Sequence, residues 1–389
     1  MPILADRMGQ LGTEAAFQVL ARATELEAQG RSIINLGIGQ PDFKTPPHIV
    51  EAACQALRDG HHGYTVANGI LPLREAVAAD IHRRHGVEVS PRRVMVVPGG
   101  KVTMFFAILM FGQPGTEIVC PDPGFPIYAS VIRFSGARVV PMPLREENGF
   151  SFRAEDVLAL LTPRTRLLIL NSPSNPTGGV VPKAELDKLA AGLQHFPDVA
   201  VLSDEIYGEL SSGPAPASMF AYPELADRLI VLDGWSKTYA MTGWRLGYGV
   251  WPEKFIPDVE RLAINSHSCV NAAAQYAGIA ALQGPRTPVE TMARTFAERR
   301  DWLIPALNRL PGIRCAVPGG AFYAFPNITA SGLDSRTVQR RLLEEAGVAT
   351  ISGTSFGQYG EGYVRLSYAS DLAALQEAVT RMGAWLGTL

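Results

Sequence analysis

The sequence predicts an α/β fold: a large domain with a mostly parallel, helix-covered sheet, and a smaller α+β domain built from the two chain ends. Two observations predict this class. Short unbroken apolar runs alternate with helical segments through the middle of the chain, as strands buried on both faces do. After Gly284-Pro285 the pattern changes to one long charged helix and short strands. We therefore predict a large domain over residues 46–285 and a small domain over residues 1–45 and 286–389.

Helices are expected before the first strand, over residues 13–29, 47–59 and 72–85. In the first of them Phe17, Leu20 and Leu26 fall near one helical face, and Gly30 follows as a C-cap. About 45 residues alone make a poor core. We therefore expect the N-terminal segment to join the C-terminal domain.

The buried strands of the large domain are expected at residues 94–97, 117–120, 137–140, 166–170, 199–202 and 229–232. None of these runs alternates polar with apolar residues, which favours parallel strands covered by helices. The small domain follows with a charged helix at 288–308, short strands at 313–317, 321–325, 348–352 and 363–369, and a last helix at 371–387.

The composition excludes several classes of protein. Lys and Arg number 35 and Asp and Glu number 37, so the net charge of −2 provides no basic field for nucleic acid. The four cysteines are too far apart for a zinc site or a disulfide framework. No apolar run reaches the ~20 residues that span a bilayer, and no signal peptide is evident. We predict a cytoplasmic protein that binds no nucleic acid, membrane or metal.

Polar motifs follow the ends of four expected strands, where ligands bind in open α/β sheets. They are NSPSNPTG (171–178), SDEIY (203–207) and SKTYAMTGWRLGY (236–248). The strand at 94–97 is followed by Gly99, Gly100 and Lys101, and glycines that open a helix expose backbone N–H groups suited to a phosphate. We expect an amide, a carboxylate, a phenol, an amine and a guanidinium to share one crevice.

In this order and spacing the motifs resemble the fold-type-I pyridoxal-phosphate enzymes, specifically the class I/II aminotransferases related to bacterial aspartate aminotransferases. The resemblance covers essentially the whole chain. It implies that Lys237 holds the aldehyde of pyridoxal 5'-phosphate as a Schiff base and then moves a proton. Asp204 would keep the pyridine nitrogen protonated. Asn175 and Tyr207 would donate hydrogen bonds to the ring oxygen O3′.

The resemblance also implies the rest of the cofactor site. Around the phosphate it implies contacts from Gly99, Gly100, Lys101, Ser236 and Arg245. Phe125 stands where an aromatic side chain stacks on the ring, and Tyr64 resembles a tyrosine that reaches the phosphate of the neighbouring subunit. Several relatives carry Trp in place of Phe125, and many carry a phosphate-binding Ser in place of Gly234. That phosphate bond is therefore expected to be lost or to come from Ser236.

For the substrate, Arg365 resembles the arginine that binds the α-carboxylate, and the Gly39 N–H and Asn175 would meet the same group. Lys101 resembles a lysine that meets a distal carboxylate in one subgroup, which predicts aspartate or glutamate as donor and 2-oxoglutarate as acceptor. A solvated Lys101 is equally compatible with the sequence. Phe125, Tyr128 and other aromatic residues would suit a broad or aromatic specificity.

We therefore expect a homodimeric aminotransferase that moves an amino group from an L-amino acid to a 2-oxo acid by a ping-pong mechanism. A carbon–sulfur β-lyase uses the same lysine, aspartate and arginines, so that alternative stays open. A non-catalytic protein on this fold is disfavoured by the intact Lys237.

Overall fold

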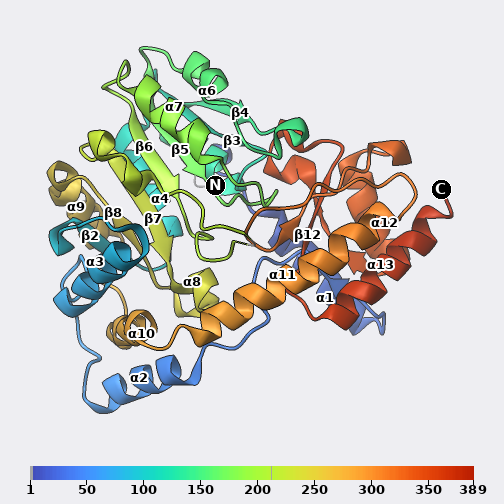
Figure 1. Ribbon diagram of the computed structural model, residues 1–389, viewed down its shortest axis with the longest axis horizontal. Coiled ribbons are helices and arrows are strands. Elements are labelled where there is room, and N and C mark those ends of the chain that lie inside the picture. The colour runs from blue at the N-terminus through green and yellow to red at the C-terminus, as the bar shows by residue number, and fades with distance from the viewer. Residues whose placement is uncertain (1–2, 212) are drawn as a thin grey trace.

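The computed structural model describes residues 3–211 and 213–389, and its centre is a seven-stranded sheet (Figure 1). The strand order is β2-β8-β7-β6-β5-β3-β4. The strands are β2 (Val94–Val97), β3 (Glu117–Asp122), β4 (Arg138–Pro143), β5 (Thr165–Asn171), β6 (Ala200–Asp204), β7 (Leu229–Gly234) and β8 (Gly247–Val250). Only β8 runs antiparallel to its neighbours. The expected α/β class with a mostly parallel sheet is confirmed.

The sheet is buried on both faces, which explains its unbroken apolar runs. Val94 and Val96 pack into one hydrophobic cluster, whereas Met95 and Val97 pack into another on the opposite face. Strand β8 was missed because its sequence GYGV shows no apolar run. The glycines of β8 have a steric explanation: a Cβ at Gly249 would clash with the side chains of Thr103 and Trp251.

Most of the helices surround this sheet and connect its strands, whereas the first helix of the chain lies with the smaller part of the molecule (Figure 1). Those of the first two thirds of the chain are α1 (Ala15–Ala28), α2 (Pro47–Arg58), α3 (Leu71–His85), α4 (Lys101–Phe111), α5 (Pro126–Ser135), α6 (Ala154–Leu160), α7 (Lys183–Leu193), α8 (Trp235–Thr238), α9 (Ile256–His267) and α10 (Ala272–Gln283). The apolar α4 contacts β5, β6, β7 and β8. Its position brings its N-terminus to the edge of the sheet where the parallel strands end.

The smaller part contains the C-terminal third of the chain, into which α11 extends (Figure 1). Its elements are α11 (Thr287–Asn308), α12 (Ser335–Ala346), α13 (Leu372–Leu386), β9 (Tyr323–Ala324), β10 (Val348–Ala349), β11 (Ile351–Ser352) and β12 (Val364–Ser367). The N-terminal strand β1 (Ile34–Asn35) pairs with β10 in parallel. Both chain ends therefore contribute to this part, as expected.

Residues 313–317 form no strand, contrary to the sequence-based expectation. Within them only Arg314 makes an isolated bridge, to Asn327. The Asn308 side chain forms hydrogen bonds with both backbone groups of Cys315. Its Oδ1 accepts from the Cys315 N–H at 2.8 Å, and its Nδ2 donates to the Cys315 carbonyl at 3.0 Å. These bonds occupy groups that a strand ladder would need.

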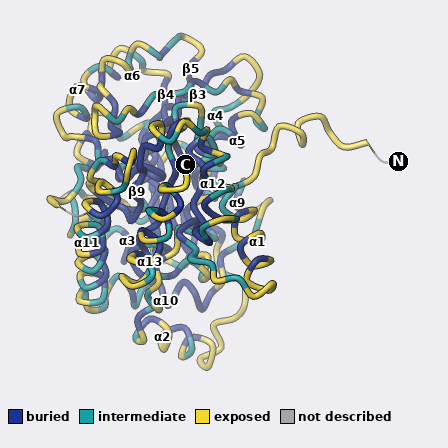
Figure 2. Tube along the Cα trace, turned by 90° about the vertical axis from the view of Figure 1, so that its right-hand side faces the viewer, coloured by how far each residue is buried: buried dark blue, intermediate teal, exposed yellow. Residues whose placement is uncertain are grey.

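The first described residues do not fold into the smaller part. Residues 3–12 are exposed, and this N-terminal segment projects away from the body of the molecule (Figure 2). At its base the Gly12 N–H donates a hydrogen bond to Ser130 Oγ of α5 at 2.8 Å. The domain boundaries at 45/46 and 285/286 stay a prediction.

The described helices include none that is long and apolar enough to cross a bilayer. The cytoplasmic location likewise stays a prediction.

Candidate active site

A cavity of about 570 Å³ lies at the ends of β2, β5, β6 and β7, between the sheet and the smaller part. Because these strands point in the same direction, the motifs that follow them meet at one edge. The predicted site residues that line the cavity are Gly39, Gly100, Lys101, Phe125, Asn175, Asp204, Tyr207, Ser236, Lys237, Arg245 and Arg365. The fold thus brings together segments from positions 39 to 365.

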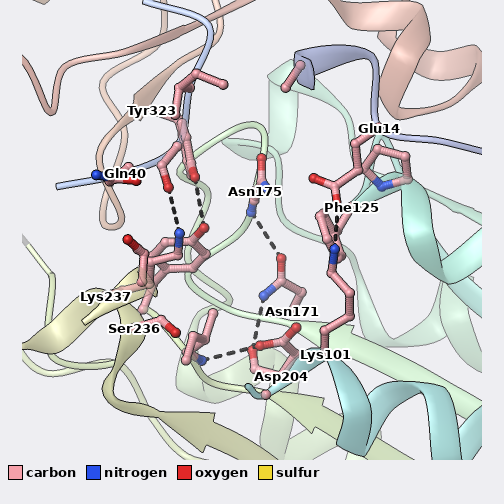
Figure 3. Close-up of a pocket in the computed structure, with 18 of the residues that line it drawn as sticks. Glu14, Gln40, Lys101, Phe125, Asn171, Asn175, Asp204, Ser236, Lys237 and Tyr323 are labelled. Carbon is pink, nitrogen blue, oxygen red and sulfur yellow. Dashed lines mark hydrogen bonds and ion pairs between the residues drawn. The ribbon is translucent and has the colours of Figure 1, made fainter. Parts of the chain in front are cut away.

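Lys237 projects into this cavity from α8, directly after β7 (Figure 3). Its Nζ donates a hydrogen bond to the Gly39 carbonyl at 2.5 Å. Burial lowers the pKa of this amine to about 8, and the Arg365 guanidinium contributes to the same effect. A lowered pKa increases the fraction of neutral amine, which is the nucleophilic form.

Asp204 ends β6 as a buried carboxylate. It accepts a hydrogen bond from the Tyr128 hydroxyl at 2.5 Å and one from the Ile206 N–H at 3.3 Å. Burial raises the pKa of Asp204 to about 6, despite these two donors. A cationic N–H group placed in the cavity beside this carboxylate would lower that pKa again, so the site suits a protonated ring nitrogen.

Arg365 comes from β12, and the hydrogen-bond partners of its buried guanidinium are neutral groups. It donates to Asn175 Oδ1 at 2.8 Å and to the Gly37 carbonyl, and it stacks 4.5 Å from the Tyr323 ring centroid. Its Nε is buried and has no hydrogen-bond partner. A buried cation with an unsatisfied donor in a cavity is suited to an anionic ligand such as a carboxylate.

Tyr207 and Asn175 lie on the same side of the cavity as Arg365. The Tyr207 and Tyr323 hydroxyls are 2.8 Å apart, and the Asn175 N–H donates to Asn171 Oδ1 at 3.0 Å. Asn171 in turn donates to the Asp204 carbonyl at 3.1 Å. These bonds connect the expected site residues through Asn171 and Tyr323.

The N-terminus of α4 and Arg245 form a second cationic region. Gly99 has φ +91°, a conformation that favours glycine, and a Cβ there would displace the Arg245 guanidinium from its position. Arg245 donates to the Thr242 carbonyl at 2.7 Å and keeps other donors free to face the cavity. Backbone N–H groups at a helix N-terminus beside a guanidinium can bind a phosphate.

Gly234 has a packing explanation. A Cβ at this position would lie 2.8 Å from Gly247 Cα, on the neighbouring strand β8. A side chain there would require the two strands to move apart. Ser236, which lines the cavity two residues later, is the hydroxyl available to a phosphate on this segment.

Tyr64 lies outside this cavity, and its side chain is 93% exposed. It borders a second hollow together with His61, His62 and Cys269. Such a position agrees with a contact to another subunit and not to its own cavity. The role expected for Tyr64 stays a prediction.

Lys101 has a partner that the sequence did not suggest. Its Nζ forms an ion pair with Glu14, and it lies 5.3 Å from the Phe125 ring centroid (Figure 3).

Tyr128 was expected only as part of an aromatic lining and Asn171 only as the start of a motif, so their hydrogen bonds to Asp204 were not predicted. The hydrogen bond between the Tyr323 and Tyr207 hydroxyls was not predicted either. Asn171 begins a motif and could have been selected. The other contacts join positions far apart in the chain, so no local signal reveals them.

Comparisons of family, sequence and structure all match this chain to aminotransferases over most of its length. The model of the family "Aminotransferase class I and II" matches residues 31–382. An aspartate aminotransferase of Geobacillus stearothermophilus is 38% identical, with 97% of this chain and 98% of that protein covered. An aromatic-amino-acid aminotransferase of Thermococcus litoralis is also 38% identical, with 97% of each covered. The solved aspartate aminotransferase of Rhizobium meliloti superposes with a TM-score of 0.95 at 32% identity, over 100% and 99% of the two chains.

Proposed function

The chain belongs to the class I and II aminotransferases, and on that premise we propose that it moves an amino group from an L-amino acid to a 2-oxo acid with pyridoxal 5'-phosphate as cofactor. A ping-pong mechanism would use one cavity for both substrates in turn. The observation that carries the proposal is the Lys237 amine in a cavity that also holds the Asp204 carboxylate and the Arg365 guanidinium.

The residues of the cavity fit this cofactor. Asp204 would bind the pyridine N–H, Tyr207 would bind O3′, and Phe125 would cover one face of the ring. The α4 N-terminus, Ser236 and Arg245 would bind the phosphate. When bound, the cofactor supplies an aldehyde and a ring that withdraws electrons from the substrate Cα.

The chain's own groups would perform the remaining work. Arg365 would bind the substrate α-carboxylate through its guanidinium, and Asn175 would fix the guanidinium by the 2.8 Å hydrogen bond. With the substrate held there, Lys237 Nζ would take the proton from Cα and return it at the next step. The lowered pKa of Lys237 suits this exchange near neutral pH.

Amino transfer is expected when the cofactor-loaded protein is given an amino acid and a 2-oxo acid. The test is a panel of amino donors against 2-oxoglutarate, pyruvate and oxaloacetate, with formation of the new amino acid as readout. Cystathionine without any acceptor serves as the comparison. Release of pyruvate and ammonia from it, without transfer in the panel, would show a carbon–sulfur β-lyase instead.

The narrower hypothesis of an aspartate or glutamate donor rests on Lys101. It must account for Glu14, which already pairs with the Lys101 ammonium. The relatives include both aspartate and aromatic-amino-acid aminotransferases, so family membership leaves the donor open.

We further propose a homodimer in which each subunit completes the other's site through Tyr64. The exposed Tyr64 and the apolar, exposed Ile3, Leu4 and Phe17 support a partner surface. Mixing an inactive Tyr64→Ala variant with an inactive Lys237→Ala variant should restore activity, because a hybrid dimer contains one intact site. A fully active monomer in sedimentation would contradict the proposal, and so would a mixture that stays inactive although hybrids form.

A further inference from the structure

Glu14 and Lys101 form an ion pair on the cavity wall away from Lys237 (Figure 3). Glu14 directly precedes α1 and Lys101 begins α4, so the pair joins the two parts of the molecule. The Glu14 side chain is 18% exposed and that of Lys101 44% exposed. Glu14 is thus the more enclosed partner, and its charge would be costly to leave unpaired.

The cavity beside the pair has apolar as well as polar lining. Its apolar lining residues include Phe17, Ile38, Phe125, Ile351 and Phe356. Phe125 lies beside the Lys101 ammonium at 5.3 Å from ring centroid to Nζ. The other cations lining the cavity are Lys237, Arg245 and Arg365, and each has a use in the proposed function. Lys101 is therefore the remaining cation that could bind a distal carboxylate of the substrate, and it already forms an ion pair with Glu14.

We propose that Glu14 is a specificity-determining residue that neutralises Lys101 and so disfavours substrates with a distal carboxylate. This inference rests on the proposed aminotransferase function. It assigns the substrate class as amino acids with uncharged, mainly apolar side chains. The same cavity serves both half-reactions, so the preferred 2-oxo acid is uncharged at its distal end as well. In that case pyruvate should be a better acceptor than 2-oxoglutarate.

The physical reason is competition for one cation. An aspartate or glutamate donor would have to take the Lys101 ammonium from Glu14, which would leave two carboxylates facing each other in a partly buried site. A cationic side chain gains little either, because Lys101 repels what Glu14 attracts. An uncharged side chain leaves the ion pair intact and packs against the apolar lining.

The half-reaction isolates the donor from the acceptor. Each donor is added alone to the cofactor-loaded protein, and the change in cofactor absorbance gives kcat/KM for phenylalanine, leucine and aspartate. In the unmodified protein, phenylalanine and leucine should exceed aspartate. Glu14→Gln should raise the aspartate value about tenfold or more, with phenylalanine changed by less than about threefold. Glu27→Gln removes the same charge from an exposed position of α1 and should change neither value.

A double-mutant cycle tests whether Glu14 acts through Lys101. Lys101→Met alone should not raise the kcat/KM for aspartate, because it leaves the Glu14 carboxylate unpaired beside the distal carboxylate of the substrate. In the Glu14→Gln background the same substitution should remove most of the gain for aspartate. A purely structural role of Glu14 would change all donors alike and would overturn the inference.

Binding without turnover separates this inference from the proposed function. Calorimetry would compare succinate, a dicarboxylate, with butyrate, which has the same chain length and one carboxylate. Glu14→Gln should strengthen the binding of succinate but not the binding of butyrate. If no donor reacts but this selective change occurs, the aminotransferase proposal fails and the role of Glu14 stands. Aspartate could instead be the best donor, with a preference that Lys101→Met abolishes while Glu14 is unchanged. That result would mean that Lys101 binds the distal carboxylate of the substrate in place of Glu14, and the inference would be wrong.

Discussion

Replacing Lys237 by alanine is expected to lower turnover by roughly 10⁴-fold or more, because one side chain both attacks the cofactor carbonyl and moves the substrate proton. Among the described residues that line the cavity, the only other amine is that of Lys101, which is paired with Glu14 on the other side. Cofactor binding should persist, because the groups proposed for the phosphate and the ring nitrogen remain. The measurement is single-turnover transfer together with the cofactor absorbance of the dialysed variant.

Two further variants make the Lys237 result specific. Lys237→Arg keeps a cation near the Gly39 carbonyl but has no nucleophilic amine, so it should be as inactive as the alanine variant. Lys254→Ala removes an exposed lysine and should leave turnover unchanged. Borohydride reduction of the unmodified protein should attach the cofactor to the peptide that contains Lys237. Attachment at another lysine, or turnover of Lys237→Ala within about tenfold of normal, would refute the assignment.

Arg365→Met is expected to lower kcat/KM for every donor by roughly 30- to 5,000-fold. Removing one partner of a buried, hydrogen-bonded charge pair costs about 2–5 kcal/mol, and each 1.4 kcal/mol is a factor of ten. The loss should not depend on the donor side chain, because every amino acid carries the α-carboxylate. The same donors tested on Glu14→Gln should show a selective change, so the two variants discriminate between the two ends of the substrate.

The conservative variant Arg365→Lys tests the geometry of the guanidinium. A lysine keeps the charge but cannot reproduce the bidentate arrangement, so we expect only partial recovery of kcat/KM. Far-UV circular dichroism and thermal unfolding monitor the fold, because Arg365 also contacts Asn175 and the Gly37 carbonyl. A donor-dependent loss in a folded Arg365→Met variant would mean that this side chain reads the donor side chain instead.

The motifs made much of the site predictable. Asn175, Asp204 and Lys237 each follow a buried apolar run within a few residues. Parallel strands bring their ends to one edge, so local patterns were sufficient to place these three residues in one cavity. Their chemical roles come from the family resemblance and await the experiments above.

Other features were beyond a local pattern. The sequence of residues 313–317 predicts a strand, but the Asn308 side chain hydrogen-bonds to the N–H and the carbonyl of Cys315, so these groups are not available to a strand partner. Strand β8 pairs with β2 and β7 through glycine-rich sequence that carries no apolar signal. One partner of β8, β2, lies far away in the chain, whereas Asn308 ends the helix just before residues 313–317 and acts through its side chain.

The amino-acid sequence by itself determined the α/β class, the positions of six of the seven strands in the large sheet and the residues that follow them, because apolar periodicity and motif spacing act over short stretches. The tertiary structure alone decided which partner each charged side chain of the site has. Lys101 meets Glu14 across 87 positions, and Arg365 meets Asn175 across 190. Coulomb interactions depend on distance in space and on burial, and only the packed fold determines either.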